Sequence, residues 1–176
     1  TLVVILEMDA GFLSADFRGP EQAAQLMLQV AGRSGREGKG RVLLQTRHPD
    51  HPLLQLAASG DYAALASDLL EERKMADLPP FGHLALFRCE AMSMGKAMEF
   101  LQQLAGIPLP PDVHLLGPVP APMERRAGRY RTQMLLQCAQ RAPLHQAISV
   151  LLEQARTLPA GRQCRWHLDV DPIDML

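Results

Sequence analysis

The chain has 176 residues, and its 18 lysines and arginines nearly balance 19 aspartates and glutamates, which gives a formal net charge of -1. This balance excludes a uniformly basic nucleic-acid-binding protein, so any nucleic-acid surface must be a local patch. The length allows one large domain or two small ones. No apolar run approaches the roughly 20 residues that a membrane-spanning helix needs, and no secretory signal pattern is present. We therefore expect a cytoplasmic protein with no membrane partner.

The first predicted element is the apolar run from Thr1 to Leu6. A continuous apolar strand is typical of the interior of a parallel sheet, which needs neighbouring strands and helices on both faces. The segment that follows predicts only one more helix and one more strand of this kind. We therefore expect the chain to be the C-terminal piece of a larger protein.

The next predicted element is a helix from Pro20 to about Arg33, and most of its positions are apolar, which predicts a largely buried helix. Its polar side chains recur every three or four residues and share one face if the helical path continues. They are Gln22, Gln25, Gln29, Arg33 and Arg36. The planar fork of arginine matches phosphate oxygens, so two arginines one turn apart suit a polyphosphate. The alternative is a pair of surface arginines that cap a helix end.

A strand over residues 41–46 completes a parallel strand–helix–strand unit, and helices over 51–58 and 61–75 follow. Two prolines then occur between Leu78 and Phe81, where they end the helix and favour an extended chain. We predict a domain boundary there, which divides the chain into residues 1–79 and 80–176.

The sequence contains one cluster of histidine and aspartate residues and three cysteines, but neither group predicts a metal site. His48, Asp50 and His51 lie within four residues, yet the neighbouring prolines favour a loop and a helix start, and no cysteine lies nearby. The three cysteines are Cys89, Cys138 and Cys164. They cannot all pair, form no C-x-x-C motif and lie in predicted strands or directly after one, so we expect buried free thiols in a reducing compartment.

The second half predicts a strand–helix–strand–strand–helix–strand order. The strands cover residues 83–90, 113–119, 129–137 and 164–170, and the helices cover 93–104 and 143–156. This is the order of the ferredoxin-like split βαβ motif, a small α+β sandwich of two layers. We expect residues from about 80 to 176 to fold alone, with Trp166 as a core aromatic.

Arginines cluster between the second and third of these strands. They are Arg125, Arg126, Arg129 and Arg131. Tyr130 lies among them, and this combination suits phosphate contact and base stacking. Because Arg129 and Arg131 alternate on one strand, we expect both to reach solvent on the sheet face that the helices leave free. The alternative is an ordinary solvated hairpin whose arginines protect a sheet edge.

The segment from Gln29 to Arg36, Q-V-A-G-R-S-G-R, resembles the last signature motif of superfamily 2 helicases. The run from Leu2 to Arg18 resembles the preceding motif of one branch of that superfamily, the replication-restart helicases. The likeness continues in order through residues 48–54, 78–81, 116–121 and 168–173. It therefore covers nearly the whole chain, which makes it far more specific than the glycine–arginine motif alone.

The resemblance implies an α/β fold in which residues 1–79 end the second RecA-like helicase lobe, with its parallel sheet. Residues 80–176 would form a DNA- and partner-binding domain whose fold is like that of ribosomal protein S10. Arg33 and Arg36 would act as arginine fingers on the ATP γ-phosphate, and Gln29 would orient the nucleotide or an arginine. The other implied nucleotide-binding residues are Asp9, Gly11 and Gly32.

The same resemblance implies a protein that unwinds DNA in the 3′-to-5′ direction, uses ATP and Mg²⁺, and acts at the nucleoid. It also implies a zinc site in an upstream segment, because the zinc-binding cysteines of the family match nothing in this chain. Implied partners are forked and single-stranded DNA, other primosome proteins and the acidic C-terminal tail of single-stranded-DNA-binding protein, with Arg141 as the candidate for its carboxylate. Since no G-x-x-x-x-G-K-[ST] motif occurs here, we expect the isolated chain to hydrolyse no ATP. The alternative is a non-catalytic nucleic-acid-binding module whose glycine–arginine segment contacts the phosphate backbone.

Overall fold

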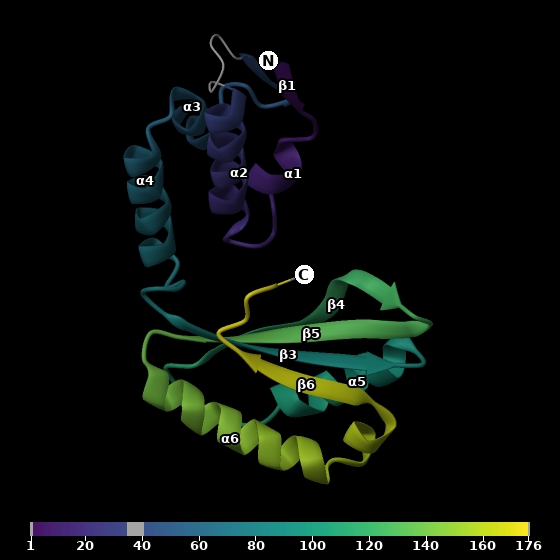
Figure 1. Cartoon of the computed structure of the whole chain (residues 1–176). Helices are drawn as coiled ribbons and strands as arrows, with labels where there is room; N and C mark the ends of the chain where they lie inside the picture. Colours follow the sequence, from purple (N-terminus) through teal and green to yellow (C-terminus); the bar gives the residue numbers. More distant parts are fainter. Residues whose placement is uncertain (1, 35–40, 176) are drawn as a thin grey trace. The chain divides into compact units, whose positions relative to one another are not determined.

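The computed structural model describes residues 2–34 and 41–175. The chain divides into two compact units, residues 1–72 and 73–176, each with its own hydrophobic core (Figure 1). This division falls inside a helix, shortly before the prolines at which we predicted a domain boundary. The boundary at residues 79 and 80 stays a prediction.

The first unit contains β1 (Leu2–Ile5), α1 (Asp9–Phe12), α2 (Gly19–Ser34), β2 (Arg41–Leu44), α3 (Pro52–Ser59) and most of α4 (Tyr62–Met75). The two strands pair in parallel, which confirms the predicted strand–helix–strand unit. β2 ends earlier than predicted because Gln45 turns into the loop, where its backbone N–H donates to Ile5 O (2.9 Å) and its carbonyl accepts from Met8 N (3.1 Å).

The prediction of a largely buried α2 is wrong in the part of the chain that the structure describes. Ala23, Ala24 and Met27 are buried, whereas the side chain of Leu26 is 50% exposed. The predicted interior strand is also half exposed, because β1 has a single strand neighbour, β2, among the described residues. A two-stranded sheet with one adjoining helix can bury only part of its apolar surface.

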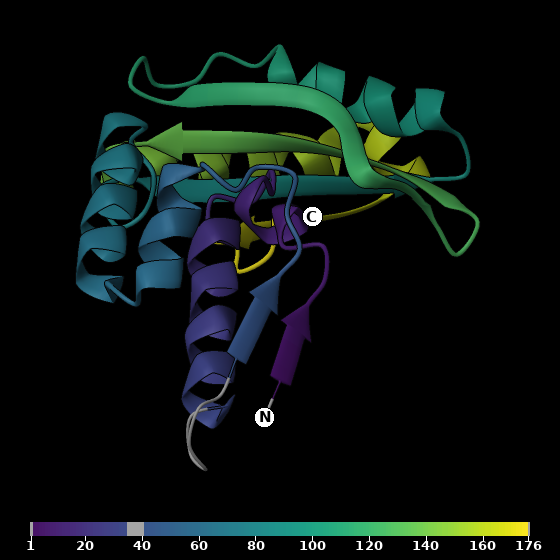
Figure 2. The ribbon, with the colours of Figure 1, turned by 90° about the horizontal axis from the view of Figure 1, so that it is seen from above.

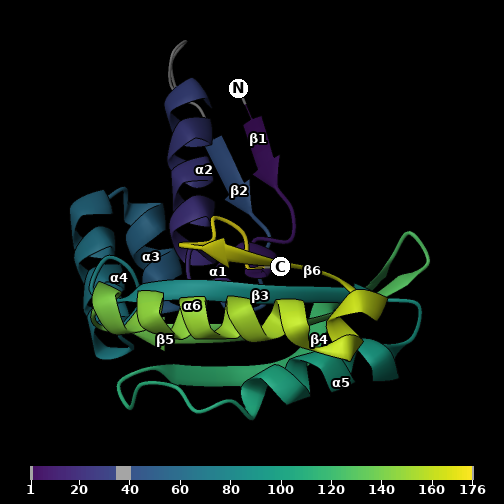
Figure 3. The same ribbon diagram turned by 90° about the horizontal axis from the view of Figure 1, so that it is seen from below.

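The second unit contains β3 (His83–Ala91), α5 (Met94–Ala105), β4 (His114–Arg126), β5 (Arg129–Cys138), α6 (Arg141–Thr157), the short 3-10 helix η1 (Pro159–Gln163) and β6 (Arg165–Val170). Its strands form one antiparallel sheet in the order β4-β5-β3-β6. Both helices cover the same face of this sheet (Figure 3). The mixed α/β class is confirmed, and the second unit leaves one sheet face without helices of its own.

Alternation along the strands separates the two sheet faces. On β3, Phe87 and Cys89 point into the helix-covered core, so Arg88 and Glu90 lie on the opposite face. Phe87 packs against Phe100 of α5 and Trp166 of β6, with ring centroids 6.2 and 5.5 Å away. The predicted role of Trp166 as a core aromatic is confirmed.

β4 is much longer than the predicted strand over residues 113–119, because it continues through Pro118, Pro120 and Pro122. Proline interrupts most strands but is tolerated on a sheet edge, where β4 lies. The strand then turns back into β5 through Ala127 and Gly128, which both have positive φ (48° and 79°), as a two-residue hairpin turn requires.

α6 begins at Arg141, before the predicted start at Pro143. Proline is tolerated in a first turn, because the N–H that it lacks would have no acceptor within the helix. Arg141 therefore lies in the first turn of α6 and not in the loop where the sequence placed it.

The cysteines are free thiols, as predicted, but their environments differ. Cys89 and Cys138 are buried in strands, whereas Cys164 is only partly buried and lies just before β6, not within it. Burial, followed by the neighbouring Cys164, raises the pKa of the Cys89 thiol far above its ordinary value.

A thiol with a raised pKa carries almost no thiolate at neutral pH and reacts slowly. We therefore expect iodoacetamide to modify Cys164 of the folded chain first, and Cys89 only after denaturation. Mass spectrometry of digests with and without denaturant measures this order. Early modification of Cys89 in the folded chain would contradict the buried environment described here.

Candidate functional site

Asp9 lies where β1 has ended and α1 begins, next to the loop that follows β2. One oxygen of its carboxylate accepts a hydrogen bond from the Thr46 hydroxyl, and the other accepts from the backbone N–H of Arg47 (2.9 Å). The bond from Thr46, then that from Arg47, lowers the pKa of Asp9. The ionised carboxylate therefore joins the two loops at the carboxyl ends of the parallel strands, where α/β sheets bind ligands.

A cavity of about 450 Å³ opens beside this junction. It is lined by Glu7, Asp9, Ala10, Leu13, Gln45, Thr46, Arg47 and His48. The lining combines an ionised carboxylate with backbone and hydroxyl groups, which can hold a ribose hydroxyl or a hydrated cation. Asp9 thus has a loop-fixing role that the structure shows, and its nucleotide-binding role stays a prediction.

Gly11 has a packing role in the structure. A Cβ added to Gly11 would lie 2.6 Å from Cβ of Ala23, so a glycine is needed where α1 crosses α2. Gly32, by contrast, lies in exposed helix with no atoms within 4 Å of an added Cβ. Of the two predicted nucleotide-binding glycines, only Gly32 leaves open space in which a ligand could approach the backbone.

Gln29 and Arg33 are both exposed on α2, and Arg33 lies in its last turn. Arg36 lies outside the described residues. Figure 2 shows α2 running antiparallel to β1 and β2, so its last turn lies beside the first residues of the strands. Asp9 follows the opposite ends of the same strands. The structure therefore does not bring Arg33 and Asp9 together.

The tip of the β4–β5 hairpin brings Arg125, Arg126, Arg129 and Tyr130 together. Arg126 pairs with Arg129 across the turn, and Arg125 pairs with Tyr130. The guanidinium carbon of Arg125 lies 5.3 Å from the centre of the Tyr130 ring, a cation–π distance. The tip extends past the ends of the neighbouring strands (Figures 2 and 3). We call Arg125, Arg126, Arg129 and Tyr130 the hairpin tip.

Arg131 differs from the hairpin tip, because only 9% of the residue is exposed. It lies opposite Glu90 of β3, with its Nε 3.5 Å from a carboxylate oxygen. The expectation that Arg129 and Arg131 reach solvent together is therefore wrong: they share a strand face, but Glu90 and the neighbouring strands cover most of Arg131. Its role in DNA binding stays a prediction.

Sequence reasoning missed a cavity of about 590 Å³ on the helix-free face of the second sheet. Its polar lining consists of Arg88, Glu90, Arg126, Arg131, His167 and Asp174, with Pro122 and Met123 beside them. We call it the sheet pocket. The signal that could have revealed it is the alternation of Arg88 and Glu90 in an otherwise apolar strand, since such residues must share the face away from the core.

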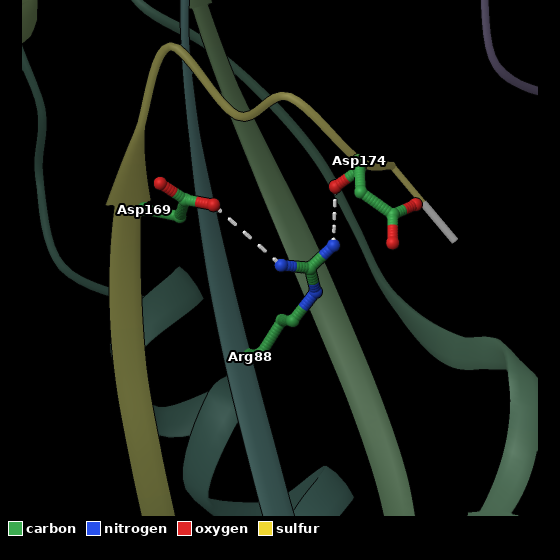
Figure 4. A network of polar contacts seen from close by, with 3 residues as sticks. All are labelled: Arg88, Asp169 and Asp174. Atoms are coloured by element: carbon green, nitrogen blue, oxygen red, sulfur yellow. Dashed lines mark hydrogen bonds and ion pairs between the residues drawn. The ribbon is translucent and has the colours of Figure 1, made fainter.

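Arg88 is held at the wall of the sheet pocket by contacts with two residues of β6 and the segment that follows it. One of its terminal nitrogens donates to the carbonyl oxygen of Asp174, and the other lies 3.7 Å from a carboxylate oxygen of Asp169 (Figure 4). Its side chain is 11% exposed, so this guanidinium has a fixed orientation. A fixed fork of N–H donors is well suited to bind an anion or a carbonyl group.

Arg141 is 65% exposed and lies 3.9 Å from the carboxylate of Asp171, which is 49% exposed. Such an exposed ion pair contributes little stability. The Arg141 guanidinium can therefore exchange this intramolecular carboxylate for one from another molecule.

His48 and His51 lie in the loop and at the start of α3, as the sequence predicted. Within residues 2–34 and 41–175, no three histidine, cysteine or acidic side chains gather as a metal site would require. No helix in the same residues has the length and apolar composition to cross a membrane.

Comparison with known proteins gives consistent matches. A family model described as the primosomal protein N C-terminal domain matches residues 74–173. The chain is 41% identical over 179 residues to the replication restart protein PriA of Haemophilus influenzae, an alignment that covers 99% of this chain and 24% of that protein. The proteins of the same name from Synechocystis sp. and Bacillus subtilis are 33% and 30% identical, over 99% and 100% of this chain and 21% and 22% of their own lengths. The chain spans about a quarter of the length of these relatives.

Proposed function

The chain belongs to the family of the primosomal protein N C-terminal domain, and from this premise we propose that it is part of a replication-restart helicase. In this role the whole protein recognises stalled forks, unwinds DNA in the 3′-to-5′ direction and supports primosome assembly. The named relatives are replication restart proteins, and their alignments cover 99% of this chain, which supports the proposal. Its place of action would be the nucleoid, in the cytoplasm.

We propose that the second unit is the DNA- and partner-binding domain, with the ferredoxin-like topology that ribosomal protein S10 also has. The antiparallel order β4-β5-β3-β6, with two helices on one face, supports this topology. The single observation that carries the binding role is the hairpin tip, where Arg125 lies over the Tyr130 ring and Arg126 pairs with Arg129 across the turn. Guanidinium groups bind phosphates and the ring offers a stacking surface, so forked or single-stranded DNA suits this group.

Replacing Arg125, Arg126 and Arg129 together by glutamine should weaken single-stranded DNA binding and flatten its dependence on salt. Each lost phosphate contact should reduce the log–log salt slope by about 0.7. Fluorescence anisotropy over a salt series measures this slope. The matched control is Arg156→Gln, since Arg156 is exposed in the last turn of α6, on the opposite side of the sheet. Equal slopes for the triple variant and the unaltered chain would rule out the hairpin tip as a phosphate-binding surface.

We propose that the first unit is the end of the second RecA-like lobe, in which Arg33 and Arg36 contact the ATP γ-phosphate and Gln29 orients the nucleotide. The parallel pairing of β1 and β2 and the exposure of Gln29 and Arg33 support this assignment. The P-loop and the Mg²⁺-holding acid would come from another part of the protein, as would the zinc site. Gly32, next to Arg33, would then belong to the surroundings of the γ-phosphate, whereas Asp9 and Gly11 would contact the nucleotide from the opposite ends of the strands.

Arg141 is our candidate for the acidic C-terminal tail of single-stranded-DNA-binding protein. Its exposure and its weak ion pair with Asp171 leave it accessible to a carboxylate. We expect Arg141→Gln to reduce the affinity for a tail peptide about tenfold, the effect of one bidentate carboxylate contact. Calorimetric titration of the peptide measures this loss, and Arg156→Gln is again the matched control. Undiminished peptide affinity would remove Arg141 from the site.

The rival function is a non-catalytic nucleic-acid-binding module. The observation that favours it is the separation of Arg33 from Asp9 at opposite ends of β1, since a nucleotide site would use both regions. The two functions differ in one measurement, the change in ATP hydrolysis when Arg33 is replaced.

A further inference from the structure

The residues after β6 lie against the helix-free face of the second sheet. Asp171 donates its backbone N–H to the carbonyl oxygen of Leu84 (2.9 Å), and Pro172 is buried. Two residues later, the carbonyl oxygen of Asp174 accepts a hydrogen bond from Arg88 at the wall of the sheet pocket (Figure 4). We call residues 171–175 the tail.

The sheet pocket carries more positive than negative side chains. Arg88, Arg126 and Arg131 line it with His167, against Glu90 and Asp174. The side chains of Arg88 and Arg131 are each 11% exposed and lie 3.7 and 3.5 Å from the carboxylates of Asp169 and Glu90. Arg88 also donates to the carbonyl oxygen of Asp174, so both guanidinium groups are held in place at the wall of the cavity. Fixed arginine forks of this kind match the oxygens of a phosphate group.

The sheet pocket also continues the hairpin tip. Arg126 belongs to both, because it pairs with Arg129 at the turn and lines the pocket. A strand of nucleic acid that contacts Arg126 at the tip therefore also lies at the edge of the pocket. In the pocket, Arg88 donates a hydrogen bond to a main-chain oxygen of the tail. An oxygen of a phosphodiester can accept a hydrogen bond from the same donor.

We propose that the sheet pocket is a second phosphodiester-binding site for single-stranded nucleic acid, and that the tail, which forms part of its wall, competes with the strand for Arg88. The carbonyl oxygen of Asp174 accepts from the Arg88 donor that a phosphate oxygen would use, and the carboxylate groups of the tail repel an incoming strand. Contact of the strand with this donor then requires the tail to release Arg88. This inference rests on the proposed nucleic-acid binding by the hairpin tip, and it adds an intramolecular competitor to it.

The direct test ends the chain after Pro172, which removes the residue that contacts Arg88. We expect this shortened chain to bind a labelled oligothymidylate about tenfold more tightly than the 176-residue chain, the equivalent of one hydrogen bond to a charged group. Arg88→Gln should weaken binding in both lengths of chain and remove the gain from shortening. Arg156→Gln should preserve the gain, and thermal unfolding checks that each variant is folded.

A second measurement does not depend on the folding of the Arg88 variant. A synthetic peptide of residues 169–175, added to the shortened chain, should compete with the oligothymidylate, and a peptide of the same composition in scrambled order should not. Unchanged affinity after shortening, with no competition by the peptide, overturns the proposal. If the shortened chain instead binds an unrelated acidic peptide and gains no affinity for DNA, the pocket is a peptide site and the proposal is also overturned.

These results separate the inference from the proposed function. When the hairpin-tip variant still loses DNA affinity but shortening changes nothing, the proposed function stands and only the competing tail is rejected. When neither length of chain binds DNA, both are rejected.

Discussion

Arg33→Ala in a form of the protein that hydrolyses ATP should lower ATP turnover by about 10³-fold, the effect of removing an arginine finger. The guanidinium would stabilise the charge that develops on the transferred phosphoryl group, so the loss should appear in kcat and not in the affinity for DNA. Steady-state ATP hydrolysis, with saturating single-stranded DNA, measures this change. Arg33 is exposed in the last turn of α2, so its replacement should leave the fold intact.

The control for this experiment is Arg156→Ala, which removes another exposed arginine, from the second unit. Arg36→Ala tests the second predicted finger in the same way, and Gln29→Ala tests the residue predicted to orient the nucleotide. Normal turnover by the Arg33 variant, together with weaker DNA binding, would favour the non-catalytic module. That outcome would assign the arginine to the phosphate backbone of DNA.

Gly11→Ala should destabilise the first unit by about 1–3 kcal/mol, the usual effect of forcing extra volume into a packed contact. The added methyl group would lie 2.6 Å from Cβ of Ala23, a distance that real Cβ atoms do not reach, so α1 must move away from α2. Hydrogen exchange of the first unit measures the loss separately from the second unit.

The matched rescue is Ala23→Gly, which removes the methyl group on the other side of the contact. Alone, this change should cost about 1 kcal/mol, because glycine is a poor residue for a helix interior. Combined with Gly11→Ala, it should recover part of the stability, so the two changes would be strongly non-additive. Simple additivity would show that Gly11 is not required for packing, and would return it to the nucleotide site.

The order of elements could be predicted because the apolar periods are clear. Leu144, Ala147 and Leu151 recur at helical spacing and are buried in α6. The length of β4 could not be predicted in this way, because its prolines are typical of a loop and only the position at a sheet edge makes a strand possible. The exposure of α2 was also unpredictable, since an apolar helix shows no sign of how many strands adjoin it.

The candidate sites also differ in how far they could be predicted from the sequence. The hairpin tip could be predicted because its arginines are near neighbours in the sequence and a two-residue turn brings them together. The sheet pocket could not, since Arg88, Arg131 and His167 come from three different strands. Only the antiparallel register places Arg88 opposite His167, and Glu90 opposite Arg131. The same register explains why Arg131 is covered although it shares a strand face with Arg129.

The prolines of β4 have a consequence for how the protein behaves in a crowded cell. An outer strand normally offers a row of amide hydrogens that invites a strand from another molecule, which is how many sheets begin to aggregate. Pro118, Pro120 and Pro122 remove that hydrogen from every second residue along this stretch. A foreign strand therefore meets an interrupted row of donors here. The long hairpin can carry its arginines away from the sheet without becoming a template on which other chains assemble.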